Sequence, residues 1–326
     1  MKKFLFPILI GMAIMILVMV VRWNSLQHHL YSGFDTWIEV DIPARFESLS
    51  PDLHQMVQEY DVLWDRFSPE SMVWIINHSS QPVPIDEVSY DLIEKAVVLS
   101  GKTEGFFNCL VAPLMDLWGF SDRPAVPPPR LLHDMVEQVS RTRIDMNPLG
   151  HEVMIRGEGK IDLGGIAKGY LVDRMVLFLK SKGVSHALVN AGGTVYGWGR
   201  PFRVGIMHPR STGLIGTVEI QDLAVSTSGD YFRFFEKEGF RYYHILNPYT
   251  GYPGRDFASV TIIDSNATEA DVLSTAVMVG GKVFIPEVER RFPRVAIIGI
   301  TAAGNITLNE RARQIFHPLS SERLKK

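Results

Sequence analysis

Cysteine is nearly absent from this chain of 326 residues, which contains only Cys109. A single cysteine excludes an intramolecular disulfide framework and any zinc or iron–sulfur centre built from the cysteines of one chain, and it is expected to pack as a small buried hydrophobe. An excess of one charge is also missing, because 33 Lys and Arg stand against 36 Asp and Glu. Nucleic acid is therefore not expected as a partner, since it requires a basic surface.

Long apolar runs are absent from most of the chain, and the exception lies at residues 4–21, between Lys3 and Arg22. As a helix this run would span about 27 Å, close to the roughly 30 Å hydrocarbon thickness of a bilayer. No small-residue cleavage site follows, so the run predicts an uncleaved anchor and not a removable signal peptide. Lys2 and Lys3 place the N-terminus in the cytoplasm. The sequence thus predicts an anchor and linker at residues 1–32 and one extracytoplasmic domain at residues 33–326.

The body of the chain reads as a mixture of helices and strands, typical of an α+β domain. Hydrophobic residues make up 46% of the chain, which is enough for a large core. A proline-rich stretch at residues 124–129 is expected to connect two lobes over the surface. Helical spacing marks residues 51–66, 88–99, 170–182 and 269–280. Strands are expected at residues 36–40, 153–156, 187–189, 202–206, 217–221, 242–246, 259–263 and 295–300.

Two glycine-rich turns stand out along this body. Residues 162–170, with Gly164 and Gly165, form a turn that opens an expected helix. Such a turn lets backbone groups approach a ligand, and the helix N-terminus offers N–H groups to phosphate. It matches neither a Walker A loop nor a dinucleotide fingerprint, and a simple helix entry remains the alternative. Residues 190–194 end an expected strand, where a tight turn is the alternative to a ligand contact.

Two further segments carry side chains suited to chemistry. His244 lies at an expected strand end beside an Asn-Pro turn, although a structural histidine is the alternative there. On the expected helix 269–280, Asp271 and Thr275 are four residues apart and Ser274 is three from Asp271. That spacing places three oxygen-bearing side chains on one face. Hard oxygens of this kind suit Mg²⁺, and a solvated helix start is the alternative.

Taken together, these segments resemble the ApbE family, the FAD:protein FMN transferases. The resemblance runs from about Gly33 to Gly280. Five segments in family order carry it, namely DLGGIAKGY (162–170), NAGG (190–193), STSGDY (226–231), HILNPYTGYP (244–253) and EADVLSTA (269–276).

The resemblance implies a bilobal α+β fold of the T-fold-like kind that binds FAD in a cleft with Mg²⁺ at the pyrophosphate. In the family reaction a threonine or serine hydroxyl of a target protein attacks the FMN phosphorus, and AMP leaves. His244 matches the active-site histidine and is the candidate base. The metal ligands would be Asp271, Thr275 and the Gly165 carbonyl, with Ser274 as an outer contributor. The flavin-contacting positions would be Phe34, Phe67, Phe106, Phe107, Asn108, Asp162 and Lys168.

The chain departs from the family pattern at two places in its N-terminal half. Phe34-Asp35-Thr36 stands where the family has Met-Gly-Thr, and Phe107-Asn108 stands where it has Phe-Asp. Asn108 thus replaces a carboxylate, and this loss is expected to change a hydrogen bond to the flavin or adenine.

The family's acceptors are extracytoplasmic flavoprotein subunits of electron-transport complexes, and the resemblance implies the same partner at the inner membrane of a bacterium, with the catalytic domain in the periplasm. Two alternatives stay open. One is a Mg²⁺-dependent FAD pyrophosphatase that yields FMN and AMP, and the other is a membrane-anchored flavin-binding protein without turnover.

Overall fold

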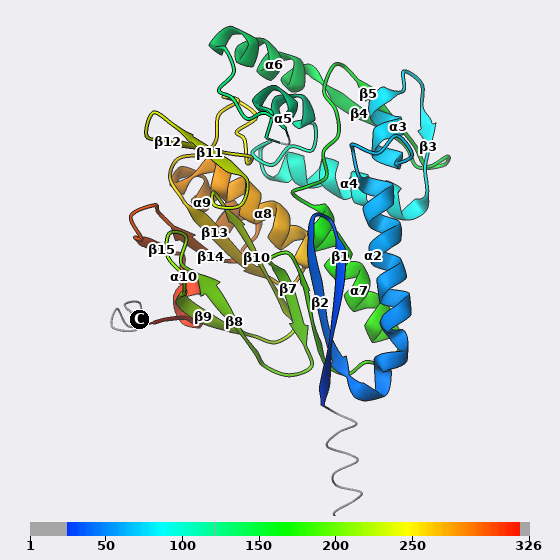
Figure 1. The fold of residues 1–326 in the computed structure, drawn as a ribbon, viewed down its shortest axis with the longest axis vertical. Helices are drawn as coiled ribbons and strands as arrows, with labels where there is room; N and C mark the ends of the chain where they lie inside the picture. The colour runs from blue at the N-terminus through cyan, green and yellow to red at the C-terminus, as the bar shows by residue number, and fades with distance from the viewer. Residues whose placement is uncertain (1–24, 121, 320–326) are drawn as a thin grey trace, which may run out of the picture.

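A computed structural model describes residues 25–120 and 122–319 of the chain, and the anchor expected at residues 4–21 lies outside them. No helix within the described residues is long and apolar enough to cross a bilayer. These residues form an α+β fold, as predicted, with helices packed around one large sheet and several small ones (Figure 1).

The large sheet has eight strands, and every neighbouring pair is antiparallel. Its order is β1 (Leu26–Gly33), β2 (Thr36–Pro43), β6 (Ala187–Ala191), β7 (Thr194–Trp198), β10 (Leu223–Gly229), β13 (Ser259–Asp264), β14 (Ala296–Ile300) and β15 (Ile306–Leu308). Strand β1 begins inside the segment expected to be linker, so the sheet starts at Leu26. Its alternation of exposed His and Gln with Leu and Tyr gives only a weak strand signal.

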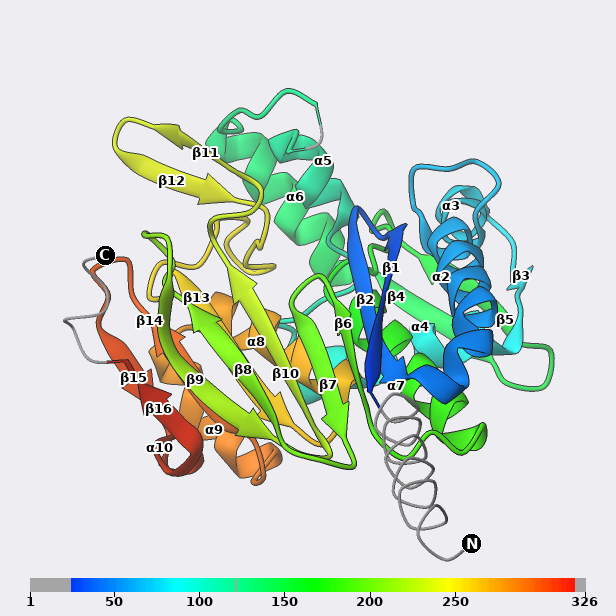
Figure 2. The same cartoon turned by 60° about the horizontal axis from the view of Figure 1, so that its bottom comes forward.

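The centre of this sheet is buried on both faces, which explains the uninterrupted apolar runs of β13 and β14. Val260 and Ile262 pack in the main core on the helical side, whereas Ile263 belongs to a second core on the opposite side. Two strands cover this opposite side, β8 (Phe202–Met207) and β9 (Leu214–Ile220) (Figure 2). They pair with each other, and β9 also pairs with β16 (Phe316–Pro318).

Two helices cover the helical side of the sheet: α7 (Ala167–Ser181) and α8 (Ala267–Gly280), which also pack against each other. Helix α8 begins where the Asn266 side chain accepts a hydrogen bond from the Glu269 N–H. Asp173 on α7 accepts from the backbone N–H groups of Ala267 and Thr268, so α7 helps to cap α8. The first turn of α8 is therefore fixed against the middle of α7.

The remaining elements surround this frame. The helical ones are η1 (Ala44–Leu49), α2 (Ser50–Trp64), α3 (Met72–His78), α4 (Glu87–Lys102), α5 (Ala112–Trp118), α6 (Pro129–Arg141), η2 (Lys282–Phe284), α9 (Ile285–Arg291) and α10 (Glu310–Ile315). The other strands form a three-stranded sheet of β3 (Val83–Pro84), β5 (Glu152–Arg156) and β4 (Arg143–Asn147), and a hairpin of β11 (Phe234–Lys237) and β12 (Phe240–Tyr243).

A third, smaller core lies under the β11–β12 hairpin. Trp118 of α5 is fully buried there, with Leu132 of α6 and Leu246 beside it, and its indole N–H donates to the Gly251 carbonyl at 2.8 Å. The proline-rich stretch connects α5 with α6 inside this one core. The expectation that it joins two lobes is therefore wrong, because its neighbours on both sides belong to the same packing unit.

Most of the elements expected from the sequence are confirmed. Helices α2, α4, α7 and α8 and strands β2, β5, β6, β8, β9, β13 and β14 all overlap the expected ranges. The strand expected at residues 242–246 is shorter, because β12 ends at Tyr243 and the chain turns at His244. Strands β10, β11 and β15 were not expected from the sequence. They contain polar residues or glycine, so their apolar residues show no clear alternation.

Candidate active site

The glycine-rich turn of residues 162–166 leads directly into α7. Asp162 fixes it, because one carboxylate oxygen accepts from the Gly164 N–H at 2.8 Å and the other lies 2.8 Å from Nε of Arg66. Lys168, in the first turn of α7, donates from Nζ to the Gly164 carbonyl at 2.9 Å. Gly164 is exposed between these two groups. The backbone of the turn is thus exposed to solvent at Gly164. The Asp162 carboxylate binds the N–H of this residue, and the Lys168 ammonium binds its carbonyl.

Gly165 lies where this turn meets α8. A Cβ added to Gly165 would stand 3.2 Å from Cε2 of Phe107 and 3.4 Å from Oγ1 of Thr275. The first separation is tighter than ordinary van der Waals contact, and the second lies at its lower limit. The missing side chain therefore lets the backbone of the turn approach the Thr275 hydroxyl.

Asp271 of α8 is buried on the same side of the helix, one turn before Thr275. One carboxylate oxygen accepts from the Gly169 N–H at 3.0 Å and the other from Oγ of Ser226 at 3.2 Å. A Cβ at Gly169 would lie 2.4 Å from the Ala267 carbonyl oxygen. The third glycine of the segment therefore serves the close packing of α7 on α8, which brings Asp271 to the start of α7.

A chain of hydroxyl groups supports these two residues from strand β10. Ser228 Oγ lies 2.8 Å from Ser274 Oγ and 3.3 Å from Thr275 Oγ1. Ser274 is fully buried and donates to the Asp271 carbonyl at 2.9 Å. Ser274 therefore holds Ser228 and stands behind Thr275, in keeping with an outer role in the site. Ser226 and Ser228 share one face of β10, because side chains alternate along a strand.

The donor set at this point suits a magnesium ion. Asp271 supplies one carboxylate, Thr275 a hydroxyl and Gly165 a backbone carbonyl, all hard oxygens. Each Asp271 oxygen uses one lone pair for a protein donor and keeps a second one. Among the residues that the structure describes, no three or more His, Cys, Asp or Glu side chains group to hold a metal. A single carboxylate fits Mg²⁺, which takes one or two carboxylates together with substrate phosphates and waters.

His244 follows the end of β12, and both its backbone N–H and its ring bind the carbonyl oxygen of Arg233. Its backbone N–H donates to the Arg233 carbonyl oxygen at 3.1 Å, and Nδ1 lies 3.3 Å from the same oxygen. A carbonyl can only accept, so Nδ1 carries the proton and Nε2 keeps its lone pair in the neutral ring. Burial lowers the pKa of His244 to about 4, with the positive charge of Arg233 as the next cause. The imidazole is thus a neutral base at physiological pH.

Two charged residues of the glycine-rich segment also influence the pKa of His244. The charge of Lys168 lowers the pKa of His244 further, whereas the carboxylate of Asp162 raises it. The structure therefore brings the candidate base and two of the predicted flavin-contacting residues into one electrostatic neighbourhood.

Two of the predicted flavin-contacting phenylalanines lie near the N-terminal hairpin and α2. Phe34 is half-buried against Trp64, with ring centres 6.0 Å apart. Phe67 is 56% exposed, and the guanidinium of Arg66 lies 4.1 Å from its ring centre. Arg66 also pairs with Asp162, so the same guanidinium contacts both the Phe67 ring and the glycine-rich turn.

The segment that follows α4 divides between the site and the protein interior. Phe107 is buried against Gly165, whereas Phe106 packs on Tyr249 and Phe284. Asn108 uses its side-chain oxygen locally, accepting from the N–H of Leu110 at 2.8 Å. The structure therefore brings Phe107 to the site and directs Phe106 toward a neighbouring aromatic cluster.

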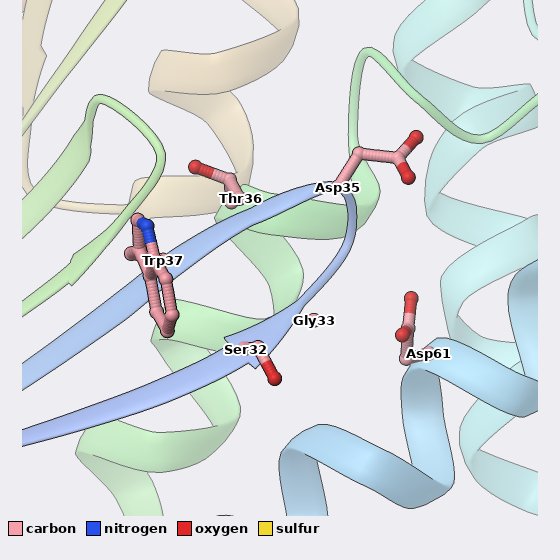
Figure 3. A pocket seen from close by; sticks show the side chains of 6 residues that line it. All are labelled: Ser32, Gly33, Asp35, Thr36, Trp37 and Asp61. Atoms are coloured by element: carbon pink, nitrogen blue, oxygen red, sulfur yellow. The ribbon is translucent and has the colours of Figure 1, made fainter.

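An open hollow lies beside the turn of the β1–β2 hairpin, and Figure 3 shows the residues that line it. Trp37 is 59% exposed on one wall. Asp61 lies opposite and accepts from the N–H of Phe34 at 2.8 Å. Burial raises the pKa of Asp61, and the nearby Asp35 and Asp65 add to this effect. Neither Trp37 nor Asp61 was among the residues predicted for the site.

Several functional contacts escaped the sequence reasoning. Ser226 and Ser228 lie in a segment that carries the family resemblance, and their spacing of two on a strand was the available signal. Arg233 had no such signal, because it acts through its backbone carbonyl and through a partner far away in the sequence, Asp35.

Comparison with known proteins identifies the family. The ApbE family model matches residues 34–298, so the chain belongs to the ApbE family. The FAD:protein FMN transferase of Treponema pallidum is 32% identical over 77% of this chain and 76% of its own length. The enzyme of the same name from Klebsiella pneumoniae is 31% identical over 84% of this chain and 89% of its own length.

Solved structures agree with this placement. The ApbE protein of Thermotoga maritima superposes with a TM-score of 0.82 at 30% identity, covering 89% of this chain and 99% of its own. The flavin transferase ApbE of Vibrio cholerae gives a TM-score of 0.77 at 26% identity, with the same coverage of both chains. The expected ApbE-like α+β fold is confirmed.

Proposed function

We propose that this protein transfers FMN from FAD to a threonine or serine hydroxyl of a target flavoprotein and releases AMP. The proposal is supported by the glycine-rich turn of residues 162–166, which has a neutral histidine on one side and an oxygen cluster on the other. Asp162 and Lys168 influence the pKa of His244, and Gly165 of the same turn meets Thr275, one helical turn from Asp271. Relatives that cover most of this chain bear the name FAD:protein FMN transferase, which supports the same reaction.

The proposed step exchanges one phosphorus–oxygen bond for another. The acceptor oxygen bonds to the phosphorus of the FMN half, and the bond from that phosphorus to the bridging oxygen breaks, so AMP leaves with the bridging oxygen. The hydroxyl proton passes to Nε2 of His244, which is free because Nδ1–H is bound to the Arg233 carbonyl. A base of this kind contributes roughly 10²- to 10⁴-fold in rate.

The glycine-rich turn and α8 would hold the pyrophosphate. Exposed backbone at Gly164 and the ammonium of Lys168 lie at the start of α7, where a helix N-terminus favours anions. Asp271, Thr275 and the Gly165 carbonyl would hold Mg²⁺. When bound there, the ion would neutralise charge on the phosphate oxygens.

One assay separates this reaction from its alternatives. The protein is incubated with FAD, MgCl₂ and a periplasmic flavoprotein subunit that carries a threonine-containing attachment segment. Flavin fluorescence that stays with the acceptor after denaturation, together with one AMP per flavin bound, is the expected result. Free FMN with AMP and an unlabelled acceptor would indicate a pyrophosphatase, and intact FAD that co-purifies without AMP would indicate a binding protein.

The proposed cellular setting follows from the N-terminal run at residues 4–21, which would anchor the chain in the inner membrane of a bacterium with its catalytic domain in the periplasm. Electron-transport flavoproteins on that side of the membrane would be the acceptors. The anchor and the acceptor are supported by the sequence pattern and by the family resemblance.

A further inference from the structure

Arg233 connects the candidate base to the opposite end of the chain. Its carbonyl oxygen receives the backbone N–H of His244 at 3.1 Å and lies 3.3 Å from His244 Nδ1. Its guanidinium Nη2 donates to the Asp35 carboxylate at 2.6 Å. One residue therefore links Asp35, on the N-terminal hairpin, with the imidazole ring that follows β12.

Asp35 occupies a constrained position on that hairpin. Phe34 and Asp35 form the two-residue turn between β1 and β2, and both have positive φ, at 55° and 56°. This conformation favours glycine and disfavours most other residues. A residue other than glycine bears a backbone cost here, and Asp35 brings a carboxylate to the turn. The Phe34 N–H bound to Asp61 fixes the turn, so the carboxylate projects from a defined place.

We propose that Asp35 and Arg233 form a positioning pair that holds the Arg233 carbonyl, and through it the ring of His244, with Nε2 directed to the acceptor hydroxyl. This inference rests on the proposed transfer function. Neither residue is catalytic, because each acts through His244. Asp35 orients Arg233 from across the site, and Arg233 fixes both the tautomer and the orientation of the imidazole.

The energetics favour a role in positioning over a role in stability. The Arg233 and Asp35 side chains are 49% and 79% exposed. An exposed ion pair of this kind contributes little to the stability of the fold. Displacement of a reacting group by about 1 Å, in contrast, costs up to about a hundredfold in rate. The pair should therefore affect the reaction far more than the fold.

The test compares D35N, R233M and the double variant with a matched control. Asparagine tolerates positive φ, so D35N removes the charge and keeps the turn. The control is E236Q, which removes a carboxylate from the pair with Arg241 on the β11–β12 hairpin that follows Arg233. D35N should lower the kcat of flavin transfer by at least about threefold, with the KM for FAD and the melting temperature unchanged. E236Q should match the wild type, and the double variant should be no slower than R233M because both changes break one contact.

Histidine NMR supplies a readout that does not depend on turnover. With isotope-labelled histidine, the His244 signal is identified by its loss in H244Q. The wild type should show the Nδ1–H tautomer, and D35N should show a larger share of the other tautomer. In R233M the ring of His244 should titrate at higher pH than in the wild type. The positive charge of Arg233 lowers the pKa of His244, as does that of Lys168, whereas Asp162 raises it.

The outcomes are distinct. D35N with wild-type transfer and an unchanged tautomer overturns the positioning role, as does a double variant whose losses multiply. A wild type that fails to label any acceptor contradicts the transfer function instead, and the NMR comparison then still decides whether the pair orients the ring.

Discussion

At the scale of single residues, His244 carries the sharpest prediction. H244Q removes the proton acceptor and keeps a polar side chain, so transfer should fall by at least about a hundredfold while FAD affinity stays near the wild type. In the wild type the rate should decline as the pH approaches about 4, where the ring becomes protonated. H244Q should lose this acidic limb. The pH profile of transfer under saturating FAD measures both effects.

A matched control for this variant is H133Q, which changes an exposed histidine on α6. Folding gives a further check, since the pKa of His244 in the folded protein lies below the ordinary value of 6.5. Stability from this group is therefore present above pH 6.5 and is lost as the pH falls toward about 4. H244Q should flatten that slope. Transfer that falls only in proportion to lost FAD binding would make the histidine structural.

Thr275 tests the proposed magnesium site without disturbing a charge. T275V keeps the shape of the side chain and removes the hydroxyl, so the MgCl₂ concentration for half-maximal transfer should rise by roughly tenfold or more. T275S restores the hydroxyl and should restore the wild-type requirement. Circular dichroism melting checks that both variants fold. Equal MgCl₂ dependence in T275V and the wild type would place the ion elsewhere.

Asp271 is less suitable for this purpose, because both its oxygens accept from protein donors. In D271N the side-chain NH₂ would replace one of these oxygens, so either the Gly169 N–H or the Ser226 hydroxyl would face another donor. A buried donor without an acceptor costs about 1–3 kcal/mol in stability. Loss of activity in D271N would therefore mix a binding effect with a folding effect.

The residue scale also shows what a sequence can and cannot predict about the site. Asp271 and Thr275 follow from helical spacing, which α8 confirms. The supporting hydroxyls of Ser226 and Ser228 required knowledge that β10 lies beside α8, a contact between distant segments. The low pKa of His244 depends on burial and on Arg233, and neither is visible in the local sequence.

At the scale of elements, the contact between α7 and α8 determines where the site forms. Gly169 permits it, since an added Cβ would stand 2.4 Å from the Ala267 carbonyl and 2.8 Å from Asp271 Cβ. G169A should therefore destabilise the protein by about 1–3 kcal/mol, the range for overpacked sites. G101A, in α4, is the control because its Cβ would meet nothing within 4 Å. There alanine should stabilise by roughly 0.5–1 kcal/mol.

Urea unfolding curves for both variants measure this difference directly. The shift in midpoint should have opposite signs in the two glycine variants, because only one of them lies at a helix crossing. A G169A midpoint equal to that of the wild type would mean that α7 moves away at little cost, and the position of Asp271 would then be less rigid than the contacts indicate.

Elements with long apolar runs were predictable from the sequence, and elements defined by their neighbours were not. Helix α8 and strands β13 and β14 have long apolar stretches that are buried on both sides. Strand β1 is recognisable mainly through its ladder with β2. Proline marks a surface connection but does not indicate how the helices on either side pack. Here α5 and α6 share one core around Trp118, so the proline-rich stretch between them does not separate two lobes.

At the scale of the whole molecule, the site gathers segments from nearly the full length of the chain. The hairpin turn at Asp35, the glycine-rich turn at Asp162, the loop at Arg233 and helix α8 all converge there. None of these segments could form the site alone. The family resemblance was informative because it covers such separated segments in order.

The path of β1 relates this site to the proposed anchor. Strand β1 begins at Leu26, shortly after the apolar run in sequence, and ends at the turn that carries Asp35 (Figure 1). At about 3.3 Å per residue the strand carries the chain roughly 25 Å. If residues 4–21 anchor the chain as proposed, β1 would connect the anchor directly to the hairpin turn beside the site.

The last prediction concerns this anchor and uses the full chain. Since residues 4–21 form an uncharged apolar run behind Lys2 and Lys3, the protein should stay in the membrane fraction at high salt and leave it only with detergent. Its purified N-terminus should still contain these residues. In intact cells the domain should resist added protease, and after removal of the outer membrane it should be digested. A mature N-terminus beyond Arg22 would contradict the anchor, and protection after removal of the outer membrane would contradict the orientation.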